Sequence, residues 1–163
     1  SPDYEDETIA MKAMKQVGIA HLSNRPYTQI SGGEMQMVIL ARALVQKTPI
    51  IIMDEPTAHL DFKNELLFLE TVVKLIRQGD ISVIMATHSP NQAFYFENQG
   101  INVKVAVMHN GNICATGKPN NILSENRIKE LYGIEAKILS QFYKDGIELR
   151  QIILLRTLIK KEV

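Results

Sequence analysis

Hydrophobic residues in the first half of the chain recur at two spacings, one typical of helices and one of buried strands. Two short apolar runs, Ile50–Met53 and Ile81–Ala86, have the length and β-branching of buried parallel strands. Between them lies a long amphipathic stretch that Gly79-Asp80 should end. A strand, a helix and a second strand in succession predict an α/β unit with a right-handed parallel crossover. Apolar positions three and four residues apart predict helices at 4–17, 35–45 and 63–78.

The second half of the chain alternates shorter apolar runs with turn residues. Residues 103–108 and 113–115 predict a hairpin, because Asn110-Gly111 between them supplies the positive φ angles of a tight turn. Ser124 and Glu125 lie near the start of a further helical stretch. We expect helices at 91–98, at 122–132 and, as an amphipathic or hydrophobic element used for packing or dimerisation, at 149–159.

A turn of small residues, Ser31-Gly32-Gly33, precedes the second predicted helix. Ser31 can act as the N-cap, and the two glycines let a ligand approach the backbone without a Cβ in the way. Free N–H groups and the positive end of the helix dipole make such a terminus a suitable anion site. The same three residues also suit an ordinary capped loop, so this turn alone does not decide between the two.

Two adjacent carboxylates, Asp54 and Glu55, follow the first predicted strand. Open α/β sheets bind their ligands at the carboxyl ends of the strands, where these side chains would lie. One carboxylate can hold Mg²⁺ through its water shell while the other polarises an attacking water. The alternative is a pair of solvated acids that simply closes a strand.

The motifs around these residues resemble the ATP-binding cassette (ABC) ATPases, and they come in the family's order. The resemblance rests on the family's signature loop at 30–34, its Walker B motif at 50–55, its D-loop at 58–61 and its switch histidine at His88. It implies an α/β fold of the P-loop NTPase type, a parallel sheet flanked by helices, with part of the ABC helical subdomain. We expect a helical-subdomain portion with the signature at 1–48, the C-terminal part of the ATPase core at 49–135 and a C-terminal extension at 136–163.

The resemblance also implies roles, because two ABC subunits of the family meet head to tail around two ATP molecules. Asp54 would hold Mg²⁺ through water, Glu55 would be the general base for the attacking water, and His88 would contact the γ-phosphate. Asp61 would communicate across the dimer. Contacts to ATP held by the other subunit would come from Ser31, Gly32, Gly33 and Glu34.

Two residues depart from the family's pattern. Glu34 replaces a glutamine and adds negative charge near a phosphate site, so we expect it either to point away or to slow closure of the dimer. His59 replaces a small D-loop residue and receives no role.

The phosphate-binding loop G-x-x-x-x-G-K-[ST] is absent from this sequence. The nearest match, Gly111 to Lys118, has its first glycine one residue too far away and Pro119 in place of the hydroxyl residue. The chain therefore resembles the C-terminal portion of an ABC subunit whose P-loop half lies upstream. We expect the chain alone neither to bind nor to hydrolyse ATP.

Composition and charge limit the classes of protein to which this chain can belong. Lys+Arg and Asp+Glu are both 18, so nothing indicates a nucleic-acid surface. The single cysteine, Cys114, excludes an intrachain disulfide and fits a reducing compartment. No apolar run reaches the roughly 18 residues of a membrane span. With the resemblance, these features favour a peripheral subunit on the cytoplasmic face of a membrane.

The pattern of residues 103–134 and the His59-Leu60-Asp61 form of the D-loop resemble subunits of iron-siderophore, haem and cobalamin importers. This resemblance implies a second ABC ATPase subunit, in a homodimer, an integral-membrane permease and an extracytoplasmic substrate-binding protein as partners. Two alternatives are a non-catalytic interaction module and an ABC protein of DNA repair or translation. The neutral charge and the lack of a coiled-coil insertion between residues 34 and 50 argue against the second.

Overall fold

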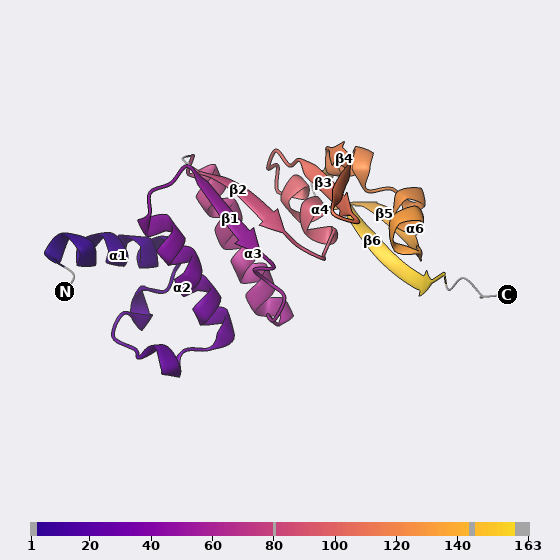
Figure 1. The fold of residues 1–163 in the computed structure, drawn as a ribbon. Coiled ribbons are helices and arrows are strands. Elements are labelled where there is room, and N and C mark those ends of the chain that lie inside the picture. The colour runs from indigo at the N-terminus through magenta and orange to yellow at the C-terminus, as the bar shows by residue number, and fades with distance from the viewer. Residues whose placement is uncertain (1–2, 80, 144–145, 159–163) are drawn as a thin grey trace. The chain divides into compact units, whose positions relative to one another are not determined.

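The computed structural model describes residues 3–79, 81–143 and 146–158, which form two compact units, Ser1–Thr87 and His88–Val163 (Figure 1). Two predictions fall partly outside the described residues, namely the role of Asp80 in ending a helix and the extension of a helix to Ile159. The division at residues 48 and 135 stays a prediction.

The first unit contains the three predicted helices and the two predicted strands. Asp3 caps the first helix through a reciprocal pair of hydrogen bonds with Asp6, and Gly18 follows the helix with φ of +82°. The elements are α1 (Tyr4–Gln16), the 3₁₀ turns η1 (Ala20–Leu22) and η2 (Tyr27–Gln29), α2 (Gly32–Val45), β1 (Ile50–Asp54), α3 (Phe62–Arg77) and β2 (Ser82–Ala86).

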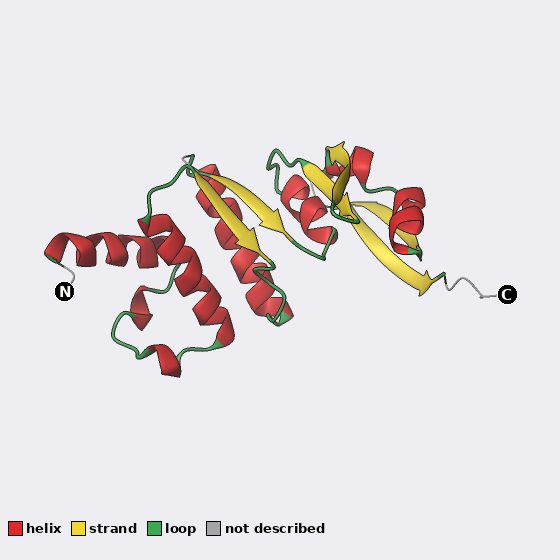
Figure 2. Cartoon of the chain, in the orientation of Figure 1, coloured by secondary structure: helices red, strands yellow, loops and turns green. Residues whose placement is uncertain are grey.

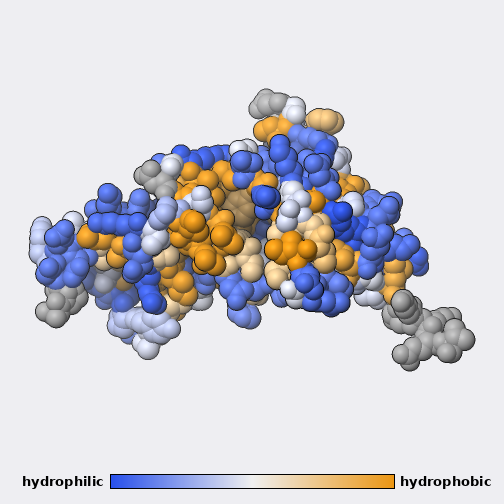
Figure 3. Space-filling model, turned by 45° about the horizontal axis from the view of Figure 1, so that its top comes forward, coloured by the Kyte–Doolittle hydropathy of each residue, from blue (hydrophilic) through white to orange (hydrophobic). Residues whose placement is uncertain are grey.

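Strands β1 and β2 pair in parallel, as predicted, in a register from Ile50 opposite Ser82 to Asp54 opposite Ala86. One face of this pair is covered, and Ile51 on it is buried. The other face carries Ile50, Ile52 and Ile84, which are 50%, 75% and 57% exposed. Figure 3 shows the hydrophobic patch over β1 and β2. The expectation of fully buried strands is therefore wrong for the described residues, in which only one face is covered.

Two groups of buried side chains support the first unit. Helix α1 packs against α2, and α3 is the most amphipathic of its long helices, with its apolar stripe buried. The buried residues of α1, η1 and α2 and the segment between α1 and η1 are Ala13, Val17, Ile19, Leu22, Met37, Leu40 and Ala41. Those of α3 are Phe68, Leu69, Thr71, Val72, Val73 and Leu75.

The second unit is a mixture of short helices and two antiparallel hairpins (Figure 2). The predicted turn is confirmed, since Asn110 and Gly111 have φ of +50° and +76° between paired His109 and Asn112. The elements are α4 (Asn91–Asn98), β3 (Val105–His109), β4 (Asn112–Gly117), α5 (Pro119–Ile122), α6 (Glu125–Tyr132), β5 (Ile134–Phe142) and β6 (Glu148–Thr157).

The helix predicted at 122–132 is confirmed over Glu125–Tyr132 but not before it, and the helix predicted from residue 149 is wrong. The helix expected at 122–132 is interrupted at Leu123, which is extended, because the Ser124 hydroxyl accepts a hydrogen bond from the Arg127 N–H and starts a new helix. The apolar run expected to be helical from residue 149 forms strand β6, paired with β5. A short apolar run is compatible with a helix or with a strand. Here the backbone hydrogen bonds to β5 determine that the run is a strand.

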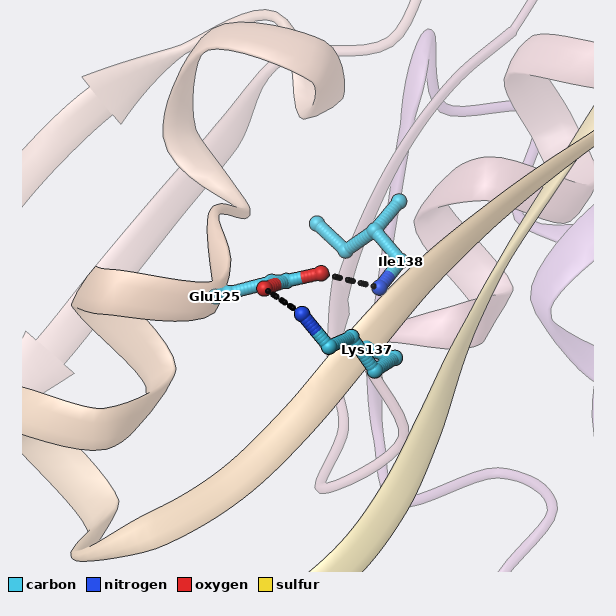
Figure 4. Close-up of polar contacts among 3 residues, drawn as sticks. All are labelled: Glu125, Lys137 and Ile138. Atoms are coloured by element: carbon cyan, nitrogen blue, oxygen red, sulfur yellow. Dashed lines mark hydrogen bonds and ion pairs between the residues drawn. The ribbon is translucent and has the colours of Figure 1, made fainter.

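Side chains from two helices close the outer edges of the β5–β6 hairpin. Ile138 and Ile152 lie opposite each other. The Ile138 N–H donates to Glu125 Oε1 at 3.0 Å, and Lys137 Nζ donates to Oε2 of the same carboxylate at 3.0 Å (Figure 4). Across the hairpin, Asn91 Oδ1 accepts from the Ile152 N–H at 2.7 Å, while Asn91 Nδ2 donates to the Ile152 carbonyl at 3.1 Å. The N–H groups of Ile138 and Ile152 are therefore not available to pair with another strand.

The core of the second unit lies at the same level of the hairpin. Phe94 is almost completely buried there, and Ile152 is 3% exposed. The remaining buried members of this cluster are Leu123, Ile128 and Ala136. Helices α4 and α6 thus contribute both apolar side chains to this core and polar side chains to the strand edges.

Candidate functional site

The turn before α2 is held in shape by a reciprocal pair of hydrogen bonds. The Ser31 hydroxyl accepts from the Glu34 N–H at 3.2 Å, and Glu34 Oε2 accepts from the Ser31 N–H at 2.7 Å. This arrangement is a capping box, and it confirms Ser31 as the N-cap. The hydrogen bond from the Ser31 N–H is the largest cause that holds the pKa of Glu34 below its ordinary value of 4.5.

The capping box accounts for the carboxylate that departs from the family's pattern. Glu34 turns back toward the N-cap, where its charge interacts favourably with the positive end of the helix dipole. The spacing Ser-x-x-Glu before a helix was a readable signal for this arrangement. This hydrogen-bonding role of Glu34 was not predicted; its charge was expected to repel a phosphate by more than the helix dipole returns.

The first amides of α2 are open to a ligand. In the described part of the chain, the Gly32 and Gly33 N–H groups donate no backbone hydrogen bond, as expected for the first turn of a helix. A Cβ built on Gly32 would meet no atom within 4 Å, so the space beside it is free. Gly33 differs, because a Cβ there would lie 2.6 Å from Cγ of Asn64.

The two carboxylates lie at the carboxyl end of the parallel strand pair. Asp54 is exposed at the last position of β1. Glu55 continues the pairing by one residue, with its N–H donating to the Ala86 carbonyl at 3.0 Å. Its φ of +45° is uncommon for a residue with a side chain, and such conformations cluster at functional sites. The backbone therefore holds Glu55 in a defined orientation just beyond the sheet.

Asp61 is the N-cap of α3, and a single neighbour uses both of its oxygens. Asp61 Oδ1 accepts from the Asn64 N–H at 2.8 Å, and Oδ2 accepts from Asn64 Nδ2 at 3.0 Å. The capping role of Asp61 was not predicted, although an Asp at this place before an apolar stripe was a signal for it. Nothing in the sequence indicated the contact between Asn64 and Gly33.

The structure brings some of the predicted residues together. Within the first unit, Asn64 joins Asp61 to Gly33, and the short loop after Glu55 leads directly to Asp61. His88 is exposed and begins the second unit, so its proximity to Asp54 and Glu55 stays a prediction. His59 is exposed in the loop before α3.

The chemistry of these groups suits a magnesium nucleotide. Among the described residues, no three His, Cys, Asp or Glu side chains are close enough to hold a metal ion by themselves. Mg²⁺ does not require such a cluster, since one or two carboxylates and the phosphates of a substrate commonly hold it. Asp54 offers an exposed oxygen ligand of the right kind, and the amides of Gly32 and Gly33 suit a phosphate oxygen. Within the described ranges, no helix is long and apolar enough to cross a membrane.

The chain is similar in sequence to known ABC transporter proteins. A family model described as ABC transporter matches residues 3–58. An uncharacterized ABC transporter ATP-binding protein of Haemophilus influenzae is 35% identical over 91% of this chain and 54% of its own length. The molybdate import ATP-binding protein MolC of the same organism is 29% identical over 98% and 60%. The hemin import ATP-binding protein HmuV of Streptomyces coelicolor is 34% identical over 78% and 44%.

Solved structures agree with the sequence comparison. An inward-facing structure, described as that of a metal-chelate type ABC transporter, matches with a TM-score of 0.84 and 28% identity, over 96% of this chain and 60% of the other. An ATP-binding cassette in its ADP conformation matches with a TM-score of 0.71 and 27% identity, over 81% and 51%. These matches confirm the predicted α/β fold. The chain spans about half the length of the curated relatives that it matches.

Proposed function

We propose that this chain belongs to the ABC transporter ATPases and forms part of the ATP-hydrolysing subunit of an importer. The observation that carries the proposal is the position of Asp54 and Glu55 at the carboxyl end of the parallel pair, with Glu55 fixed by its bond to Ala86. Carboxylates at this edge are suited to a metal ion and a water rather than to packing.

Each predicted site residue has a role in this proposal. Mg²⁺ would be held by Asp54 and would neutralise phosphate charge. Glu55 accepts a proton from the water that attacks the γ-phosphate. His88 contacts the same phosphate, and Asp61 belongs to the interface between two ATPase subunits.

The turn before α2 completes the site from the opposite subunit. Ser31, through its hydroxyl, and Gly32 and Gly33, through N–H groups that donate no backbone hydrogen bond, bind the γ-phosphate of a nucleotide held by the partner subunit. Glu34 fixes the shape of this turn, because its carboxylate is held at the Ser31 N–H. It thus contributes by orientation rather than by a direct contact with the anion.

The partners and the cargo follow from the relatives. We place the subunit at the cytoplasmic face of a membrane, against an integral-membrane permease served by an extracytoplasmic binding protein. Iron-siderophore, haem or cobalamin is the cargo that we favour, because relatives include a hemin import protein and a ferric enterobactin transport protein. The molybdate relative makes an oxyanion the second candidate. Uptake of each labelled cargo by a deletion strain distinguishes them.

A carboxyl-to-amide change tests the catalytic role. In the full-length subunit, Glu55→Gln keeps the shape of the side chain and removes its capacity to accept a proton, so turnover should fall roughly 10²- to 10⁴-fold with ATP binding retained. Glu70→Gln, an exposed change on α3, is the matched control and should leave turnover unaltered. Phosphate release and nucleotide binding are the measurements. Retention of most of the turnover by Glu55→Gln would remove Glu55 from the base role.

The chain of 163 residues by itself is expected to bind ATP very weakly, because its sequence has no loop to hold the β-phosphate. Isothermal titration calorimetry measures this directly. Micromolar affinity would show that these residues contain a nucleotide site of their own.

A further inference from the structure

The contact between Gly33 and Asn64 is the closest approach that the structure records at any glycine. A Cβ on Gly33 would lie 2.6 Å from Cγ, 2.7 Å from Oδ1 and 3.1 Å from Cβ of Asn64. Carbon atoms of separate side chains do not approach so closely, so a methyl group here would displace the Asn64 side chain from its present position. The amide group of Asn64 therefore lies directly against the backbone of the α2 N-terminus.

The Asn64 side chain is itself held in place. Its Nδ2 donates to Asp61 Oδ2 at 3.0 Å while its backbone N–H donates to Asp61 Oδ1 at 2.8 Å. Two hydrogen bonds to one carboxylate fix both the first turn of α3 and the orientation of the amide. Asn64 is only partly exposed, unlike its neighbour Lys63, which is exposed.

These contacts form a continuous connection through the first unit. Glu55 is tied to β2 through the Ala86 carbonyl, and the loop after Glu55 ends at Asp61. From Asp61 the connection passes through Asn64 to Gly33, whose N–H belongs to the proposed phosphate-binding turn. The Asn64 side chain thus lies between that turn and the end of the loop that follows the proposed general base.

We propose that Asn64 is a positioning residue that couples the phosphate-binding turn Ser31–Gly33 to the loop between Glu55 and Asp61. The inference rests on the proposed function for its catalytic consequence. Asn64 acts through its contacts with Gly33 and Asp61, and so keeps the first amides of α2 in place relative to the loop that follows Glu55. Because donors aimed at developing charge act only at the correct position, loss of this contact should affect turnover more than nucleotide binding.

Kinetics of the full-length subunit provide the first test. Asn64→Ala removes the amide and should lower kcat about ten-fold while KM for ATP changes less than about two-fold. Lys63→Ala, one residue earlier on the exposed side of α3, is the matched control and should leave both constants unaltered. A purely structural role would lower the Tm and the yield of Asn64→Ala without changing kcat per folded molecule.

A double-mutant cycle provides the second test, and it does not depend on ATPase activity. Gly33→Ala should lower the Tm by several degrees, because the new methyl group meets Asn64. In the Asn64→Ala background the methyl group that Gly33→Ala introduces has room, so this change should lower the Tm clearly less than in the wild type. Additive effects on Tm would overturn the contact, whatever the kinetics show.

The two tests separate failure of this inference from failure of the proposed function. A coupled cycle with a selective fall in kcat supports the positioning role. A coupled cycle with an unaltered kcat, in a wild-type subunit that turns over ATP, overturns the inference and leaves the proposed function intact. Absence of turnover in the wild type overturns the proposed function and the positioning role together, while the cycle still reports the contact.

Discussion

The parallel pair β1–β2 of the first unit and the hairpin β5–β6 of the second differ in how completely their own unit covers them. The parallel pair β1–β2 buries Ile51 on one face and leaves Ile50, Ile52 and Ile84 exposed on the other (Figure 3). The hairpin β5–β6 buries Ile152 in a core of its own and has both outer edges bonded to side chains of helices. Parallel strands are normally buried on both faces, so the first pair is the unusual one.

This difference between the two strand pairs agrees with the proposed function, which assigns site residues to only one of them. The exposed pair carries Asp54 and Glu55, and its uncovered face has the apolar character of a surface that packs against further protein. The hairpin carries none of the predicted site residues. Its core and its edge bonds come from residues between 91 and 152, which all belong to the second unit. Substitutions at matching positions in the two pairs should therefore have unequal effects.

The largest effect is expected in the core of the hairpin. Ile152→Ala removes three carbons from a side chain that is 3% exposed and should lower the free energy of unfolding by about 2–5 kcal/mol. Urea unfolding followed by circular dichroism measures the loss, and amide hydrogen exchange shows that it falls on residues of the second unit. Ile153→Ala, at the next and more exposed position, is the control. Equal losses for both would contradict the packing of Ile152.

A smaller, pH-dependent effect is expected at the edge of the same hairpin. The hydrogen bond from the Ile138 N–H, and after it that from Lys137, holds the pKa of Glu125 below its ordinary value of 4.5. A carboxyl whose pKa is lowered on folding stabilises the protein above its unfolded pKa, and this stabilisation is lost as the pH falls through the folded pKa. Between pH 7 and pH 3 the wild type should therefore lose more stability than Glu125→Gln.

Two controls locate the source of that pH dependence. Glu130→Gln changes an exposed carboxyl at the far end of α6 and should leave the profile unaltered. Lys137→Ala removes the ion pair and keeps the bond to Ile138, so most of the pH dependence should remain. Urea midpoints at a series of pH values supply the measurement. A steeper profile for Glu125→Gln than for the wild type would contradict the sign.

Local signals predicted much of the fold. Periodicity located the three helices of the first unit, the parallel strands and the Asn110-Gly111 turn, because each depends on residues that are close in sequence. The strand at residues 148–157 escaped prediction, since its partner lies beyond a turn and the apolar run suits a helix equally well. Long-range pairing, rather than local preference, determined that element.

In the candidate site, too, local features were predicted from the sequence and a long-range contact was not. The N-cap at Ser31 was predicted from its place before an apolar stripe, and the position of Asp54 at a strand end from the apolar run before it. The contact of Asn64 with Gly33 joins two helices that are distant in sequence, so only tertiary packing could reveal it. Roles of Asp54, Glu55, Asp61 and His88 in catalysis came from resemblance and stay predictions.

The smallest effect is expected on the exposed face of the parallel pair, and it tests the comparison most directly. Ile52 is 75% exposed, so in the chain of 163 residues Ile52→Ala should change the free energy of unfolding by no more than about 0.5 kcal/mol. Ile51→Ala, on the buried face of the same strand, is the matched control and should cost about 2–5 kcal/mol.

The same pair of variants should behave differently in a protein as long as the curated relatives. If further residues cover the exposed face there, Ile52→Ala should cost nearly as much as Ile51→Ala, because both methyl-bearing side chains would then be buried. Urea unfolding of both lengths gives the four values. A cost for Ile52→Ala that stays small in the longer protein would show that this face remains open to solvent, and the contrast between the two strand pairs would then be a property of the folded subunit itself.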